Sequence, residues 1–325
     1  MTDILALAGN NLLSPMILCF VLGLLAALAR SDLSVPEAAA KALSIYLLFA
    51  IGFKGGAAVG DHGIGFSLVS ALAAGVLLSV ALPFVAFGLL RVLTQFSVAD
   101  AAAVAAHYGS ISIVTFVTAT SVLEGRGISS EGYMVAVAAA MEAPAIISAL
   151  WIVAKVGEGA DVDSDLWREI LLNGSIVLLV GSFVIGLLTG AEGLARIESF
   201  IVSPFQGVLC LFLLDMGLVA GRGLRTSGRV LGAGAILFGV LMPPIGAAAG
   251  LLMGAGLGLS AGGLALLMTL AASASYIAVP AAMRVALPEA NPSIYLTLSL
   301  GVTFPFNLTV GIPLYVALAS AVAGG

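Results

Sequence analysis

Two short polar stretches interrupt long apolar segments of the sequence, and their residue types suit the binding of a small anion. The first is His107–Thr115 (HYGSISIVT) and the second is Ala271–Pro280 (AASASYIAVP). With an offset of 163 residues they align as G-S-x-S over A-S-x-S. Glycine and several hydroxyls in the middle of a membrane helix indicate a polar function at that depth. One such break in each half of a chain is typical of the midplane site of a transporter.

The two breaks predict an anion cradle made of helix ends. We expect the helices to break at Gly109 and near Ala274, so that two half-helix N-termini point at each other across the midplane. Their free N–H groups and the positive ends of their dipoles attract an anion without a fixed cation. The alternative is that these small residues only allow close helix packing. The predicted anion-binding residues are Gly109, Ser110, Ile111, Ser112, Ser273, Ala274, Ser275 and Tyr276.

An acidic residue within an apolar segment predicts a cation site. Glu142 lies two residues before Pro144, and the matching segment of the second half carries hydroxyl and amide groups around Pro305. An intramembrane carboxylate is costly and is a functional candidate by default. Oxygen-rich helix breaks suit sodium. The alternative is a protonated Glu142 that holds a kinked helix. The predicted sodium ligands are Glu142, Thr303, Asn307 and Thr115.

Other polar residues in the apolar segments favour structural roles. With an offset of 161, Lys54 aligns with Asp215, and the two side chains either pair near the axis relating the halves or reach their own interfaces. For His107 we expect helix packing rather than a proton relay. A cluster of arginines is interpreted first as a determinant of topology, and it consists of Arg222, Arg225 and Arg229.

The composition is that of a helical membrane protein. Of the 325 residues, 61% are hydrophobic and 9% charged, and the mean hydropathy is +1.19. Soluble domains carry about a quarter charged residues. No basic patch suggests a nucleic-acid partner, and the two cysteines are too few for a disulfide framework. Metalloprotease and serine protease motifs are absent, so we expect no enzyme and no organic cofactor.

A membrane crossing takes about 20 residues, and on this measure we predict an all-α polytopic protein with about ten transmembrane helices. The two halves resemble each other, and an odd number of helices per half inverts the second copy. We expect a first five-helix repeat at 1–156, a cytoplasmic connector at 157–168 and a second repeat at 169–325. The expected spans are 12–29, 38–58, 65–93, 97–123, 132–156, 169–189, 202–221, 229–255, 260–286 and 293–320.

The distribution of Lys and Arg predicts the orientation. With the N-terminus outside, nine of the 12 basic residues fall on the inner side and three on the outer side. We therefore expect both termini to face the periplasm of a bacterial inner membrane, with lipid around the helices. The inner residues are Arg30, Lys41, Arg91, Lys155, Arg168, Arg222, Arg225, Arg229 and Arg284, and the outer ones are Lys54, Arg126 and Arg196.

Longer blocks of the chain resemble the sodium-dependent bicarbonate transporter family of cyanobacteria and other bacteria, from about Ser14 to Tyr315. These blocks are Ile51–Gly56 (IGFKGG), Ala106–Phe116 (AHYGSISIVTF), Ser273–Arg284 (SASYIAVPAAMR), Leu287–Tyr295 (LPEANPSIY) and Thr303–Tyr315 (TFPFNLTVGIPLY).

The resemblance implies a fold related to bile-acid symporters and sodium/proton antiporters, with core and gate domains and broken crossing helices. It implies sodium-driven bicarbonate uptake by an elevator movement, a homotrimer, and inhibition by a cytoplasmic PII-like protein. Two alternatives stay open. One is a symporter of another small anion or a sodium/proton antiporter on the same fold, and the other is a regulated anion channel.

Overall fold

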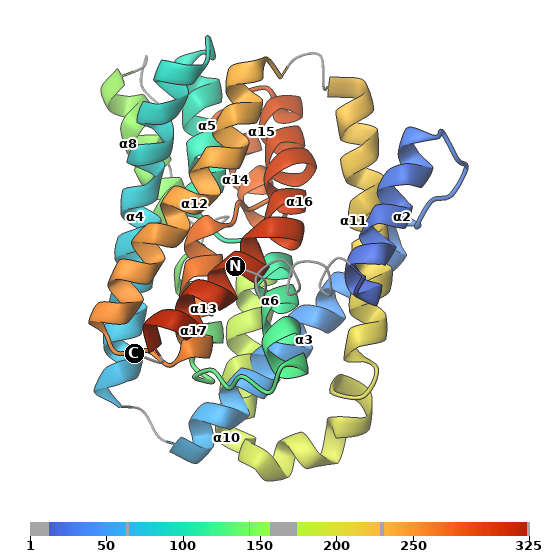
Figure 1. Cartoon of the computed structure of the whole chain (residues 1–325), viewed down its shortest axis with the longest axis vertical. Helices are drawn as coiled ribbons and strands as arrows, with labels where there is room; N and C mark the ends of the chain where they lie inside the picture. Colours follow the sequence, from blue (N-terminus) through green and yellow to red (C-terminus); the bar gives the residue numbers. More distant parts are fainter. Residues whose placement is uncertain (1–12, 63–64, 143, 157–173, 228–230, 324–325) are drawn as a thin grey trace.

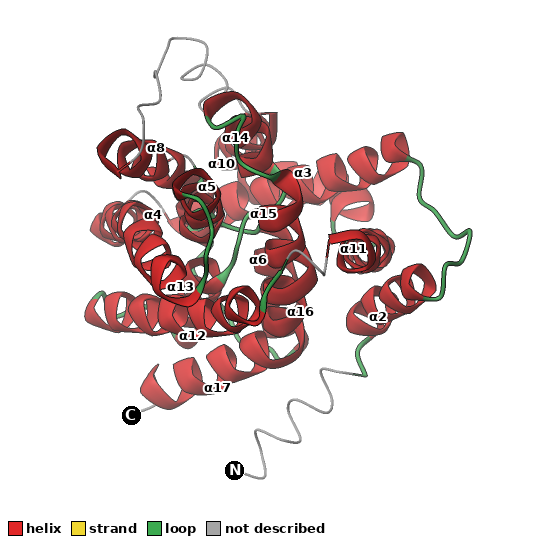
Figure 2. Ribbon diagram, turned by 90° about the horizontal axis from the view of Figure 1, so that it is seen from above, coloured by secondary structure: helices red, strands yellow, loops and turns green. Residues whose placement is uncertain are grey.

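The structure is a computed structural model, and it describes residues 13–62, 65–142, 144–156, 174–227 and 231–323. Throughout these ranges the regular structure is helical, with no β-strand (Figures 1 and 2). The predicted connector 157–168 lies outside the described residues. The helices are α2 (Pro15–Leu28), α3 (Glu37–His62), α4 (Phe66–Leu93), α5 (Val98–Gly109), α6 (Ile113–Gly125), α7 (Met134–Ala140), α8 (Pro144–Val156), α10 (Gly174–Ile201), α11 (Phe205–Ser227), α12 (Ala233–Gly256), α13 (Ala261–Ala272), α14 (Ala278–Ala286), α15 (Pro292–Leu298), α16 (Phe304–Phe306) and α17 (Ile312–Ala323).

The helices have the length and composition of membrane spans. In the described chain, eight segments are long and apolar enough to cross a membrane, and Pro15–Leu28 and Ala261–Ala272 are shorter apolar helices. Large apolar side chains such as Leu188 and Leu252 are exposed, as expected of a surface that faces lipid. The protein is therefore a multi-pass membrane protein, as its composition predicts.

One helix extends beyond its predicted end. The span expected to stop at residue 189 continues in α10 to Ile201. Gly190, with φ 59° and ψ −157°, turns the chain between two helical segments. This backbone conformation is readily available only to glycine. The residues after Gly190 therefore form a second helical segment in a new direction.

Two parallel helix pairs form one side of the molecule, and the first is α2 with α11 (Figure 1). Their backbones touch at glycines. A Cβ on Gly23 would overlap the Leu214 carbonyl, and a Cβ on Gly217 would overlap the Phe20 carbonyl. Small residues of this kind allow the close approach that stabilises helix pairs in membranes.

The second pair, α3 with α10, repeats this arrangement. Here Gly186 meets the Phe53 carbonyl and Gly56 meets the Phe183 carbonyl. Residues 20 and 23 become 183 and 186 on adding 163, and residues 53 and 56 become 214 and 217 on adding 161. The two helix pairs therefore make equivalent contacts between equivalent residues.

The remaining helices form a second group around α4 and α12, which pack against each other and against the helices that contain the breaks (Figure 2). In the first half, Pro83 of α4 lies against Gly109, where a Cβ would overlap the proline ring. In the second half, Gly246 of α12 lies against the backbone of Ala271 and Ala272. These contacts again involve residues 163 apart, 83 with 246 and 109 with 272.

The helices α5 and α13 begin at serine caps, and each start is bonded to the opposite half of the chain. Ser97 caps α5, and Asp100 in its first turn accepts a hydrogen bond from the Asn291 N–H at 2.8 Å. Ser260 caps α13, and the Glu131 carboxylate accepts from its N–H at 2.7 Å and from its hydroxyl at 2.9 Å. These bonds connect the outer ends of the broken helices to the loops before α15 and α7.

Candidate functional site

The two polar breaks of the sequence meet inside the second helix group. Helix α5 ends at Gly109 and α13 ends at Ala272, as their glycine and serine residues predict. The Ser275 N–H donates to the His107 carbonyl at 2.8 Å, and the Ser112 N–H donates to Ser273 Oγ at 2.9 Å. Segments some 160 residues apart therefore form one crossing of extended chain between four helix ends.

The hydroxyls of the four serines have different environments. Ser112 Oγ caps α6 and accepts from the N–H of Thr115 at 3.2 Å and from its Oγ1 at 2.9 Å. Ser273 Oγ donates to the Leu270 carbonyl at 2.9 Å, and Ser275 Oγ accepts from the N–H of residue 279 at 3.4 Å. Ser110 Oγ is buried and has no hydrogen-bond partner within the described chain. A buried hydroxyl without a partner is costly unless a ligand or water completes it.

The crossing borders a small cavity of about 10 Å³, room for roughly one water molecule or bare cation. Glu142 reaches it from the break between α7 and α8, and Tyr276 from the second crossing segment. Glu142 Oε2 and the Tyr276 hydroxyl make no hydrogen bond of ordinary geometry to the described residues. The cavity lining consists of Ile111, Ser112, Ile113, Glu142, Ser275, Tyr276 and Ile277.

The backbone at the break between α7 and α8 is held by α4. Ser79 Oγ donates to the Met141 carbonyl at 2.6 Å, and Ser148 Oγ donates back to the Val80 carbonyl at 3.0 Å. Pro144 at the start of α8 cannot donate to that turn. These bonds hold the segment that presents Glu142 to the cavity.

Two of the predicted sodium ligands lie apart from this cavity. Thr303 Oγ1 donates to the Gly239 carbonyl at 2.7 Å and is also bonded to the Tyr108 hydroxyl at 2.5 Å. Asn307 Nδ2 donates to the Ala272 carbonyl at 2.9 Å. Of the four predicted ligands, the structure brings Glu142 to the cavity, and Thr115 is bonded to Ser112, which lines it.

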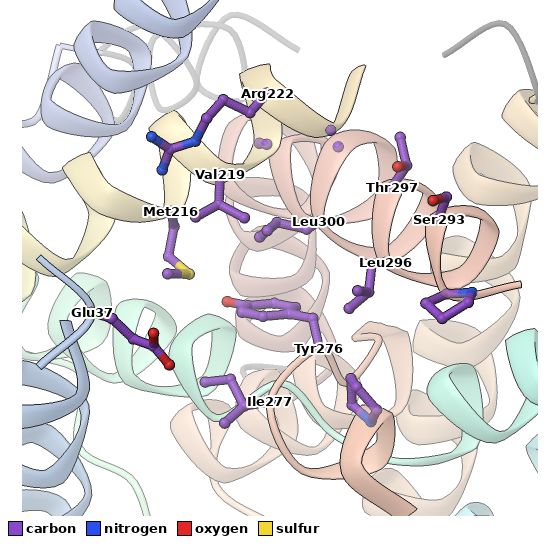
Figure 3. A pocket seen from close by; sticks show the side chains of 15 residues that line it. Glu37, Met216, Val219, Arg222, Tyr276, Ile277, Ser293, Leu296, Thr297 and Leu300 are labelled. Carbon is purple, nitrogen blue, oxygen red and sulfur yellow. The ribbon is translucent and has the colours of Figure 1, made fainter. Parts of the chain in front are cut away.

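A larger crevice separates the two helix groups and ends at Tyr276. Its volume is about 730 Å³, and α11 lines one side while α14 and α15 line the other. Figure 3 shows the Tyr276 ring in the centre of this crevice, with its hydroxyl directed toward Met216. The exposed side chains of Glu37, Arg222 and Ser293 also line it. The contribution of α11 has no local signal in the sequence, because Met216 is one apolar residue among many.

The other singled-out polar residues take structural contacts. Lys54 pairs with Glu124, with Nζ–Oε1 of 2.8 Å, and not with Asp215, which is buried elsewhere on α11. His107 Nδ1 bonds the Ala103 carbonyl at 2.6 Å, and its ring stacks on Tyr295 with centroids 4.4 Å apart. This geometry is that of the helix-packing role expected from the sequence.

The residues of the site suit hard, weakly bound ions. The described ranges contain no group of three or more His, Cys, Asp or Glu side chains that could hold a transition metal. The cavity instead offers one carboxylate, hydroxyls and the N–H groups of two half-helix starts. Such groups bind alkali cations and small oxyanions.

Comparison with known proteins identifies the family. Among curated proteins no relative matches the chain. The sequence profile of the Na⁺-dependent bicarbonate transporter superfamily matches residues 15–320, which is nearly the whole chain. Because the family is one of transporters, the match implies a transport protein and not an enzyme. This chain belongs to the Na⁺-dependent bicarbonate transporter superfamily.

Proposed function

We propose that the protein takes up bicarbonate coupled to sodium by an elevator-type alternating-access mechanism. The observation that carries the proposal is the small cavity where Glu142 faces the starts of α6 and α14. The carboxylate can bind a cation, and the two positive helix ends can bind an anion in the same cavity.

Bicarbonate binds at the crossing of the two breaks. The positive ends of the helix dipoles at the starts of α6 and α14 attract the anion. The hydroxyls of Ser110 and Tyr276, which make no hydrogen bond of ordinary geometry to the described residues, gain partners. The cavity of about 10 Å³ is too small for bicarbonate beside a cation. Binding therefore opens the crossing toward the crevice at Tyr276.

Sodium binds at Glu142, with oxygen atoms of the neighbouring Ser112–Thr115 turn completing its shell. Thr303 and Asn307 belong to the ligand set predicted from the sequence, but their side chains are bonded to backbone carbonyls, so we omit them from the primary site. Each ion offsets the charge of the other in a medium of low dielectric constant. Neither ion should therefore bind well alone, which is the physical basis of coupling.

The helix contacts support two inverted repeats. Helices α2 and α11 run parallel, as do α3 and α10, while successive helices within each half alternate in direction. The second helix of each half is therefore parallel to the first helix of the other half, which is the relation expected of two inverted repeats. The repeats span 1–156 and 169–325, with the connector at 157–168 between them.

The two helix groups correspond to a gate and a core. We take α2, α3, α10 and α11 as the gate, and the helices around α4 and α12, including both breaks, as the core. The crevice between them opens on the side of Arg222, which the distribution of basic residues places in the cytoplasm of a bacterial inner membrane. The conformation is then inward-open, and both termini are periplasmic.

Assembly as a homotrimer and control by a cytoplasmic PII-like protein remain proposals from the family resemblance. Helix α10 supports the first, because only 17% of its most apolar window is buried within one chain. Side chains including Val177, Val184 and Leu188 leave an apolar face for lipid or for another copy. The open crevice on the cytoplasmic side supports access for a regulator.

Uptake of radiolabelled bicarbonate into proteoliposomes at fixed pH, with and without an inward sodium gradient, tests the function. We expect saturable uptake that requires sodium. Uptake indifferent to sodium would indicate a channel or uniporter. Sodium or proton flux without bicarbonate uptake would indicate an antiporter, and uptake of another small anion in its place would indicate a different symporter.

A further inference from the structure

Three residues at spacings of four form a hydrogen-bonding device in the last membrane segment. Asn307 and Gly311 are the first and last residues of a π-helical turn, and Tyr315 follows one turn later in α17. The Tyr315 hydroxyl donates to Asn307 Oδ1 at 3.0 Å. A Cβ on Gly311 would meet both Asn307 Oδ1 and the Tyr315 ring. The missing side chain at 311 is therefore what lets Tyr315 reach back eight residues.

The other end of Asn307 is bonded to the crossing. Asn307 Nδ2 donates to the Ala272 carbonyl at 2.9 Å. Ala272 is the last residue of α13, and the final carbonyls of a helix have no partner within it. Asn307 and Tyr315 are both almost fully buried, so water cannot take over these bonds easily. The side-chain amide of Asn307 thus gives a hydrogen-bond partner to the C-terminal carbonyl of α13, next to the proposed anion cradle.

The bond to Ala272 also constrains the residues that would contact the ion. Ser273 follows directly, and its hydroxyl accepts from the Ser112 N–H. Asn307 therefore holds the carbonyl of the Ala272–Ser273 peptide, and the Ser112 N–H holds the side chain of Ser273. At the equivalent place of the first half, subtracting 161 from 307 gives Ile146, which has no polar group. The device is specific to the second break.

We propose that Asn307, oriented by Tyr315, is a positioning residue for the anion cradle and not a sodium ligand. The inference rests on the proposed transport function and deepens it. Asn307 Oδ1 accepts from Tyr315 and Nδ2 donates to Ala272, and Asn307 does not belong to the residues that line the cavity beside Glu142. It acts on the ion through the backbone that it holds.

Hydrogen exchange in nanodiscs tests the proposal independently of the cargo. We expect amide exchange of the segment 272–276 to rise roughly three- to tenfold in Asn307→Ala, since about one hydrogen bond is lost. Gly311→Ala and Tyr315→Phe should give smaller rises, because they disturb only the orientation of the amide. Thr309→Val is the matched control, since Thr309 Oγ1 bonds the Pro305 carbonyl within its own helix. Unchanged exchange at 272–276 in Asn307→Ala would overturn the proposal.

Transport kinetics then separate positioning from sodium ligation. At saturating sodium, Asn307→Ala and Tyr315→Phe should both raise KM for bicarbonate, roughly three- to tenfold for the first, with little change in Vmax. If Asn307 were a sodium ligand, saturating sodium would instead compensate for its loss. A wild-type KM for bicarbonate in Tyr315→Phe under these conditions would contradict the proposal. If the wild-type protein carries no bicarbonate, the proposed function fails, while hydrogen exchange still decides the role of Asn307.

Discussion

Lys54 of α3 and Glu124 of α6 form an ion pair of 2.8 Å between the two helix groups, on the side opposite the crevice. Lys54 lies 17 residues beyond Glu37 on the same helix, which corresponds to about 26 Å of rise. The pair therefore joins the two helix groups away from the crevice, while Glu37 lines the crevice itself. In the proposed elevator movement this bond must break.

Replacing Lys54 by Gln should shift the protein away from the inward-open conformation. A partly exposed pair contributes about 0.2–1 kcal/mol, so the shift in population is up to about fivefold. Maleimide labelling of Leu296→Cys in the crevice, with both native cysteines replaced by alanine, should slow accordingly. Arg196→Gln, which removes a pair within α10, is the control. An unchanged labelling rate in Lys54→Gln would contradict this role of the ion pair. So would a double variant, Lys54→Glu with Glu124→Lys, that fails to recover the wild-type labelling rate.

Removing single serine hydroxyls should distinguish an anion-binding role of these residues from a role in helix packing. Ser110→Ala is expected to raise KM for bicarbonate roughly three- to tenfold while leaving thermal stability unchanged, because its Oγ has no partner in the protein. Ser273→Ala should raise KM and also lower stability, since that hydroxyl bonds both crossing segments. Ser121→Ala is the control, because its buried Oγ is equally unpartnered but lies further along α6. Wild-type uptake in Ser110→Ala and Ser273→Ala would exclude the cradle.

Neutralising Glu142 should weaken sodium dependence. In Glu142→Gln the cavity loses its only carboxylate, and we expect the sodium concentration for half-maximal uptake to rise by roughly tenfold or more, as for loss of a charged partner. Uptake is measured against sodium at fixed bicarbonate and pH. Glu289→Gln, at an exposed position, should behave like the wild type. If Glu142→Gln keeps the wild-type sodium curve, sodium binds elsewhere.

Gly263 is expected to be intolerant of a side chain. Its position in the first turn of α13 faces the Glu131 carboxylate, which a Cβ would overlap. Gly263→Ala should lower stability by about 1–3 kcal/mol through overpacking and loss of the bond from Glu131 to Ser260. Gly88→Ala in α4 meets no atom and should be neutral or stabilising. The midpoint of thermal unfolding in detergent measures both, and equal midpoints would show that Glu131 moves freely.

Much of the architecture follows from local sequence. Long apolar runs require membrane helices, because the backbone must satisfy its own hydrogen bonds in lipid. The glycine and serine residues at 109–112 end α5 and cap α6. At the second break Ser273 ends α13, and Ser275 Oγ accepts from the N–H of residue 279 in α14. The offsets of 161 and 163 reappear in the glycine contacts of the two helix pairs, because those contacts join residues that the offsets relate. Family membership is likewise readable from the residues alone.

Tertiary structure decided how the polar groups are used. The sequence shows that Glu142, Thr303 and Asn307 are polar and buried, but not which of them meet a partner. Whether a buried oxygen is free for an ion depends on bonds to residues tens or hundreds of positions away, such as Tyr108 for Thr303 and Ala272 for Asn307. The crevice, likewise, arises only where α11 meets α14 and α15. Composition and spacing therefore determined the fold class and the place of the breaks, while packing between distant helices decided which polar groups face the cavity.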